Sequence, residues 1–185
     1  MRKSREAAAQ SRSRIVNAAS RMLRSRGVDG TSVADVMQAA GMTHGGFYKH
    51  FASKVELSDL AARAAFEEIV ARFDEREKIE GLQAAQKAYC AEYLSLAHVE
   101  HPELGCPVAA FGADAGRLAG ALAPAFAEGA ERLIERFDAT EGAAAGRAEA
   151  IRRLASLIGA VVVARAVGDG PLREEILAAF VSDGN

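Results

Sequence analysis

The sequence predicts an all-α fold of about nine helices, on three observations. Residues typical of helix starts and helix ends recur four times within roughly the first 55 positions. The alternation of apolar and polar residues that marks a strand appears nowhere. Alanine is abundant, proline is limited to four residues and tryptophan is absent. Since alanine is the strongest helix former and proline the weakest, this composition favours helices, and 185 residues suffice for a substantial core.

The amino-terminal part predicts four helices with local start signals. Apolar side chains at helical spacing define the first, which Gly27 ends. Ser32 and Ser53 each stand three residues before an acidic residue, the pattern of a capping box at a helix start, and Thr43 caps a short helix between them. These helices are expected over residues 10–26, 32–41, 43–51 and 53–77.

The remaining sequence keeps the helical pattern. Pro107 fits the first turn of a helix, and turns are expected at Gly81 and at 168–171. A polar loop is predicted over residues 98–105, and helices over 82–96, 107–116, 120–139, 147–167 and 172–181. We divide the chain into a basic mobile arm (1–9), a helix-turn-helix domain (10–54) and a second helical domain (55–185).

Charge is distributed unevenly along the chain. Residues 1–54 contain ten basic and three acidic residues, whereas the remainder contains 13 basic and 22 acidic ones. The formal net charge of −2 therefore conceals a basic end and an acidic body. Such asymmetry predicts that only the amino-terminal module binds a polyanion such as nucleic acid, although basic residues on a solvated helix would give the same count.

The short segment THGGFYKHF (43–51) carries the chemistry that suits DNA. It places His44, Tyr48, Lys49 and His50 within two turns, beside two glycines. These side chains donate hydrogen bonds and neutralise phosphates, and glycine allows a close backbone approach, as a helix in the major groove requires. Phe47 is predicted to pack under this helix rather than to touch bases.

Other classes of function find little support. The two cysteines cannot form a disulfide framework or a zinc ribbon, and the spacing of His98, His101 and Cys106 fits no established metal site. Nucleotide, phosphate and hydrolase motifs are absent, so we expect no enzyme, no cofactor and no metal. The longest apolar run (154–164) has 11 residues, against about 20 for a bilayer span. We expect a cytoplasmic protein without a membrane segment.

The amino-terminal pattern resembles that of the TetR family of bacterial transcriptional regulators. The matching features are Gly30-Thr31, the Ala40-Gly41 turn, Gly46, Phe47-Tyr48, Phe51 and Ser53-Lys54. They cover about residues 10–60, and GCPVAAFGAD (105–114) and SLIGAVVVARAVGD (156–169) are similar to one branch of the family.

The resemblance implies a homodimer that binds double-stranded DNA at a pseudo-palindromic operator and responds to a small-molecule effector. Positions carried over as DNA-binding are Thr31, Ser32, Thr43, His44, Gly46, Phe47, Tyr48, Lys49, His50 and Lys54. Those expected around the ligand cavity, unless they form ordinary core, are Phe66, Tyr89, Tyr93, Cys106, Phe111 and Phe126. A dimer interface is expected at Leu154, Ile158, Val161, Val162, Arg165 and Leu177.

The sequence thus predicts a ligand-responsive transcriptional repressor. One alternative keeps the DNA-binding scaffold but replaces the ligand by oxidation or alkylation of Cys106, whose place at a helix start would lower its pKa; a buried thiol at a tight turn is the competing interpretation. The other is a helical small-molecule-binding protein without an operator. The operator, the effector, the target genes and the choice between repression and activation are not encoded in any recognisable motif.

Overall fold

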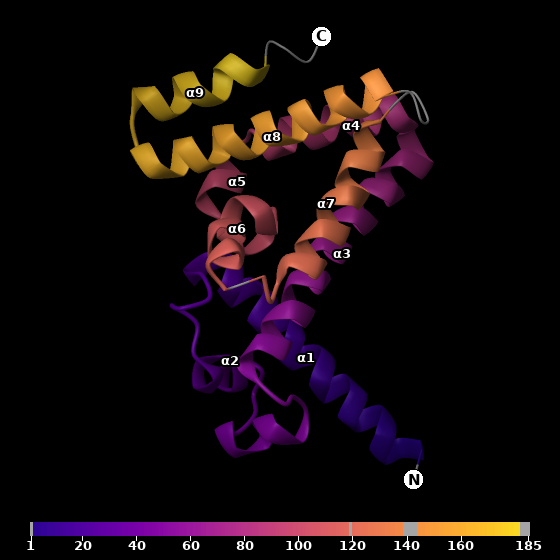
Figure 1. Ribbon diagram of the computed structural model, residues 1–185, viewed down its shortest axis with the longest axis vertical. Helices are drawn as coiled ribbons and strands as arrows, with labels where there is room; N and C mark the ends of the chain where they lie inside the picture. The colour runs from indigo at the N-terminus through magenta and orange to yellow at the C-terminus, as the bar shows by residue number, and fades with distance from the viewer. Residues whose placement is uncertain (1, 119, 139–143, 182–185) are drawn as a thin grey trace.

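The computed structural model describes residues 2–118, 120–138 and 144–181, and every regular element in these ranges is helical (Figure 1). The predicted all-α fold is therefore confirmed. The α-helices are α1 (Arg2–Arg26), α2 (Val33–Ala39), α3 (Lys54–Glu80), α4 (Leu82–Tyr93), α5 (Leu96–Glu100), α6 (Pro107–Arg117), α7 (Ala123–Phe137), α8 (Ala144–Val167) and α9 (Pro171–Val181). Two short 3-10 helices are η1 (His44–Lys49) and η2 (Pro102–Leu104).

Both predicted serine caps form. Ser32 Oγ accepts the backbone N–H of Asp35 at 3.1 Å, and Ser53 Oγ accepts that of Glu56 at 3.1 Å. The second cap is reciprocal, because the Glu56 carboxylate accepts the Ala52 N–H at 2.7 Å. Between the caps, Gly41 adopts a φ of +70°, which a residue with a Cβ rarely tolerates, and this glycine makes the turn from α2 to η1.

Three local predictions differ from the structure. Residues 2–9, expected as a mobile arm, form the first turns of α1, consistent with the helix-favouring run Ala7-Ala8-Ala9. The 43–51 segment forms the 3-10 helix η1, and Thr43, its N-cap by position, makes no side-chain capping bond. The expected loop at 98–105 instead contains η2 and the end of α5, which Ser95 caps.

Two clusters of buried apolar residues share helix α3. The amino-terminal cluster joins α1, α2 and η1 to the first turns of α3, and it also takes in Phe111 and Leu122. The second cluster joins the rest of α3 to α4 and to α7–α9. The division at residue 54 stays a prediction, because side chains from beyond it complete the amino-terminal core.

Helix α3 links the two ends of the molecule (Figure 1). It rises from the η1 end beside α7, and the antiparallel pair α8 and α9 lies across the opposite end. Helices α3 and α7 approach closely at Gly129, where a Cβ atom would overlap with the ring of Phe66. Among the helices described, none is long and apolar enough to cross a membrane.

Candidate DNA-binding surface and ligand cavity

Helix η1 presents the polar side chains that the sequence singled out. Tyr48 is 76% exposed, His44 and Lys49 are exposed, and His50 is half-buried. Ser32 and Thr43 are also exposed, at the starts of α2 and η1. A Cβ atom added to Gly45 would have nothing within 4 Å, so the fold does not require glycine there.

The inner faces of these elements form the core. This confirms the predicted packing of Phe47 under the helix and corrects its place among the DNA-binding positions implied by the resemblance, and the side chains of Thr31 and Lys54 also bond internally. Phe47 is buried and stacks on Phe51 with ring centroids 5.5 Å apart, so its side chain faces away from any ligand on this surface. Thr31 is 2% exposed and donates its hydroxyl to the carbonyl of Gly27. Lys54 donates its ammonium to the Val28 carbonyl at 2.7 Å, which ties α3 to the turn after α1.

Arg12 on α1 holds the end of η1 in place. Its guanidinium donates to the His50 carbonyl, pairs with Glu56 at 3.0 Å and lies 4.4 Å from the ring centroid of Phe51. The Ala52 N–H and then Arg12 hold the pKa of the Glu56 carboxyl below its ordinary value. Arg12, Arg24 and Lys54 are thus bound internally, whereas Arg14, Arg21, Arg26 and Lys49 are exposed.

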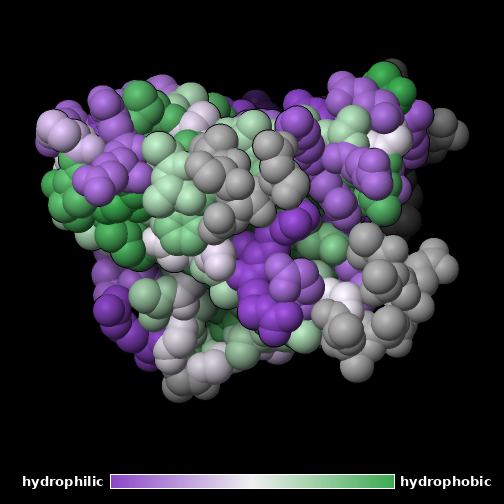
Figure 2. Space-filling model, turned by 90° about the horizontal axis from the view of Figure 1, so that it is seen from above, coloured by the Kyte–Doolittle hydropathy of each residue, from purple (hydrophilic) through white to green (hydrophobic). Residues whose placement is uncertain are grey.

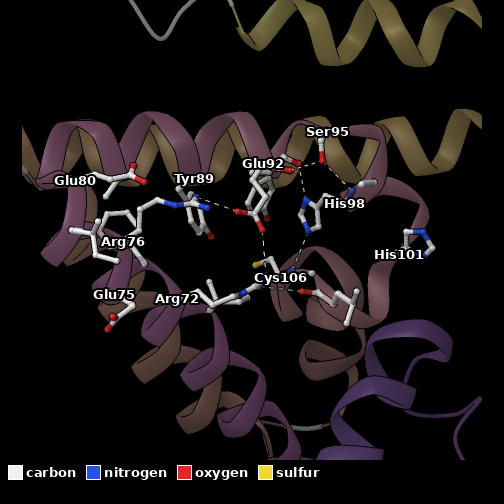
Figure 3. A pocket seen from close by; sticks show the side chains of 18 residues that line it. Arg72, Glu75, Arg76, Glu80, Tyr89, Glu92, Ser95, His98, His101 and Cys106 are labelled. Carbon is white, nitrogen blue, oxygen red and sulfur yellow. Dashed lines mark hydrogen bonds and ion pairs between the residues drawn. The ribbon is translucent and has the colours of Figure 1, made fainter.

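A cavity of about 490 Å³ lies between α3, α4 and the segment that leads into α6 (Figure 3). Of the six predicted lining residues, Tyr89, Tyr93 and Cys106 do line it. Phe66, Phe111 and Phe126 do not: their rings pack edge-to-face on one another in the core, with centroids 5.2–5.5 Å apart. Charged lining residues that the sequence reasoning missed include Arg72, Arg76 and Glu92.

The two cavity tyrosines keep their hydroxyls buried, and neither hydroxyl has an oxygen or nitrogen partner among the described residues. The Tyr93 hydroxyl lies beside the Cys106 thiol, which is only a weak acceptor. Burial raises the pKa of Tyr89 and of Tyr93 well above its ordinary value, so both hydroxyls stay protonated. Buried polar groups are normally paired, and each exception calls for an explanation.

Cys106 begins α6 as predicted, but its thiol is buried and its pKa moves in the opposite direction from the prediction. Burial raises the pKa, and this outweighs the lowering by the Tyr93 hydroxyl and by backbone N–H groups of α6. The thiol is therefore protonated, whereas the reactive form of cysteine is the thiolate. The structure gives the Cys106 switch no support.

His98 connects three segments at the edge of the cavity. Its Nδ1 lies 2.6 Å from the Tyr93 carbonyl and donates to it, and its Nε2 accepts the Cys106 N–H at 3.1 Å. These partners fix the neutral form, in agreement with a pKa lowered mainly by burial. The ring leaves no room for a Cβ at Gly105.

Arg24 joins the cavity wall to the amino-terminal helices. Although it is almost fully buried, its guanidinium donates to the Gly105 carbonyl at 3.0 Å and pairs with Glu68 at 2.8 Å. From the cavity side, Arg72 donates to the neighbouring Leu104 carbonyl at 3.2 Å. The adjacent carbonyls of Leu104 and Gly105 thus accept hydrogen bonds from α3 and from α1, respectively. The sequence feature that could have indicated this contact is the position of Arg24 beside the apolar stripe of α1, one turn after Ser20.

The predicted dimer residues separate into two groups. Leu154, Val161 and Leu177 are buried within the chain, and Arg165 donates to the carbonyls of His98, Val99 and Ala109, so these four stabilise the subunit itself. Val162 is exposed and Ile158 is half-buried. Exposed apolar side chains that the prediction missed are Ile151, Val163, Val167, Leu172 and Phe180. Figure 2 shows apolar surface gathering at the left, where α8 meets α9.

No group of three or more His, Cys, Asp or Glu side chains is placed to hold a metal ion in the part of the chain that the structure describes. The site therefore consists of an exposed polar 3-10 helix at one end and a cavity behind it, linked through residues 104–106 and Arg24. Helices α2 and η1, joined by the Gly41 turn, define the class: a helix-turn-helix protein with a helical second half.

Comparisons with known proteins identify the family. Residues 15–61 match the family model described as "Bacterial regulatory proteins, tetR family". An uncharacterized HTH-type transcriptional regulator of Mycobacterium tuberculosis is 32% identical over 167 residues, which cover 83% of this chain and 84% of that protein. The HTH-type transcriptional regulator TtgR of Pseudomonas putida is 42% identical over 57 residues, which span 31% of this chain and only 27% of TtgR.

Solved structures share the fold. The reduced form of NemR from E. coli superposes with a TM-score of 0.76 at 18% identity and covers 94% of this chain and 96% of NemR. A TetR-family regulator from Agrobacterium tumefaciens gives a TM-score of 0.77 at 21% identity, with 95% and 98% coverage. The chain belongs to the TetR family and is a DNA-binding transcriptional regulator.

Proposed function

We propose that the protein is a homodimeric repressor that a small molecule releases from a palindromic operator. Ligand control is supported by the position of Gly105. This residue lines the cavity, and its carbonyl accepts a hydrogen bond from Arg24 on α1. A ligand that shifts residues 104–106 therefore acts on the amino-terminal helices through a direct contact. Release requires that the ligand bind the DNA-free arrangement more tightly than the DNA-bound one.

We infer that η1 enters the major groove and that Tyr48, Lys49, His44 and His50 contact the DNA. The exposure of His44, Tyr48 and Lys49 supports this, as does the open space over Gly45, and the half-buried His50 lies at the end of the same helix. Lys49 suits guanine acceptors, whereas Tyr48 and His50 suit phosphates. In a two-fold dimer the two η1 helices would read half-sites about 34–36 Å apart.

The dimer is proposed to form through the exposed apolar face of α8 and α9. Val162, Val163, Val167 and Leu172 are exposed in the single chain, and a contiguous apolar surface of this kind commonly marks an interface. A two-fold axis would bring this face against its own copy and complete a four-helix arrangement.

The test is selection of bound duplexes from a random DNA library with purified protein at two salt concentrations. We expect an enriched palindrome whose affinity falls with salt at a log–log slope of about −0.9 per phosphate contact. Tyr48→Ala and Lys49→Ala should abolish enrichment, while Lys78→Ala, a matched change at the far end of α3, should not. Recovery of no palindrome would refute the operator, and recovery of a single half-site would refute the dimer.

A further inference from the structure

We propose that the cavity binds an uncharged, largely apolar molecule that carries a hydrogen-bond-accepting oxygen, as an aromatic ketone or quinone does, and that the hydroxyls of Tyr89 and Tyr93 hold this oxygen. The inference rests on the proposed function, because it names the ligand class for the same cavity.

The two hydroxyls point to an acceptor in the ligand. Both oxygen atoms are buried. The Tyr89 hydroxyl has no partner among the described residues, and the Tyr93 hydroxyl has only the Cys106 thiol, a weak acceptor, beside it. The phenols stay neutral, so each offers a proton to an acceptor. The two rings pack on each other, with centroids 5.6 Å apart. Leaving a buried donor unpaired is unfavourable, and a ligand oxygen within reach of the hydroxyls would remove that cost.

The rest of the interior indicates an apolar body. Ile69, Phe73, Ala85 and Leu104 line the cavity beside the tyrosine rings. The volume of about 490 Å³ lies within the range of about 300–1,000 Å³ that small-molecule sites occupy. The Tyr89 ring packs edge-to-face on Phe73, so two neighbouring aromatic rings contribute to the lining.

The charged groups indicate that the ligand is uncharged. Arg72 and Arg76 share the carboxylate of Glu92, at 3.4 and 3.3 Å, as Figure 3 shows. His98 is neutral and uses both ring nitrogens. The lining also holds Glu75, which pairs with Lys78, and Glu80, so three cations at the cavity are balanced by three carboxylates. A charge on the ligand would therefore be buried without a free counter-charge, which is strongly unfavourable.

Isothermal titration calorimetry with three naphthalene probes substituted at the same ring position tests the proposal. Acetylnaphthalene supplies the neutral acceptor, ethylnaphthalene has the same size without it, and naphthoate carries a charge. We expect the ketone to bind roughly two- to tenfold more tightly than the hydrocarbon, the gain typical of one added hydrogen bond, and naphthoate to bind most weakly.

Single-atom variants assign the effect to the hydroxyls. Tyr89→Phe and Tyr93→Phe should each reduce ketone affinity without changing hydrocarbon affinity. Both should keep or raise the thermal stability of the free protein, since an unpaired buried hydroxyl is removed. Ser25→Ala, which removes a hydroxyl from the exposed side of α1, is the control and should change neither ketone binding nor DNA binding.

The outcomes separate the two proposals. Equal affinities for ketone and hydrocarbon, tighter binding of naphthoate, no binding of any probe, or ketone affinity unchanged in both phenylalanine variants would overturn the ligand class. DNA binding to the selected palindrome is measured on the same preparations by fluorescence anisotropy. If the protein binds the palindrome but the probes fail, the proposed regulator function is retained and this ligand class is rejected. A ketone that binds as expected but releases no duplex would keep the ligand class and refute the switch.

Discussion

Gly45 is a residue whose presence the isolated fold does not explain. It lies in η1 with open space around its Cα, whereas Gly41, four residues earlier, has a φ of +70° that makes glycine necessary. We expect Gly45→Ala to leave the free energy of unfolding unchanged or to raise it by up to about 1 kcal/mol. The same variant should lose operator affinity, because a methyl group would meet the DNA.

Gly41→Ala is the matched control for that prediction. It should destabilise the protein by about 1 kcal/mol or more, since the turn would then force an alanine into the left-handed region. Urea unfolding and anisotropy on the selected palindrome measure both effects. A Gly45→Ala protein with full operator affinity would show that the backbone does not approach DNA there.

His98 makes stability depend on pH. Burial lowers its pKa in the folded state below the ordinary 6.5, so the unfolded chain takes up a proton first as the pH falls. The stabilisation is fully present above about pH 6.5 and is lost as the pH falls toward the folded-state value. We expect a lower free energy of unfolding at about pH 5.5 than at about pH 7.5, and a smaller difference in His98→Asn.

His101→Asn serves as the control, because His101 is exposed and lies only three residues away. It should retain the full pH dependence of the wild type. If His98→Asn retained it as well, the titration would belong to other groups.

At the scale of elements, α1 is connected to the segment before α6 by Arg24. Removing this guanidinium leaves the Gly105 carbonyl without its donor and Glu68 without its partner. We expect Arg24→Met to lower the free energy of unfolding by about 3 kcal/mol, since hydrogen bonds to buried charged groups are strong. Arg63→Met, which breaks exposed ion pairs with Asp59 and Glu128, should cost less than about 1 kcal/mol. Equal losses in urea unfolding would contradict a structural role for Arg24.

Helices α3 and α7 pack closely because residue 129 has no side chain. In Gly129→Ala the new methyl group would overlap with Phe66, so the helices would have to separate. We expect a loss of about 1–3 kcal/mol, as for other overpacked cores. Gly116→Ala on α6, where nothing lies within 4 Å, should be neutral or slightly stabilising. If Gly129→Ala had the thermal stability of the wild type, α7 would be able to move away from α3 without a loss of stability.

The elements found from the sequence are those whose signals are local. Ser32, Ser53 and Gly41 each start or end a helix through residues within one turn. Their effect can therefore be predicted from the adjacent residues in the sequence. Helix α5 was missed because it has only five residues, and contacts from Arg165, more than 60 positions away, bind its carbonyls. The packing of Phe66, Phe111 and Phe126 on one another likewise depends on where α6 and α7 lie, which helical spacing does not encode.

At the scale of the whole molecule, the exposed apolar face of α8 and α9 predicts the oligomeric state. We expect a dimer by analytical ultracentrifugation, which Val162→Glu should weaken by placing a charge in the interface. Ala84→Glu, an equivalent change on the exposed side of α4, should leave the dimer intact. A monomeric wild-type protein would contradict the proposed interface. If Val162→Glu left the dimerisation affinity unchanged, the interface would have to lie on another surface.

The placement of the three tyrosines has a practical consequence. The chain has no tryptophan, and one tyrosine lies on the exposed surface of η1 while the other two line the cavity. Replacing all three with fluorotyrosine would give fluorine NMR signals that come only from these two places. A single spectrum would then report on occupancy at both ends of the molecule, and a titration at one end would show directly whether the other responds.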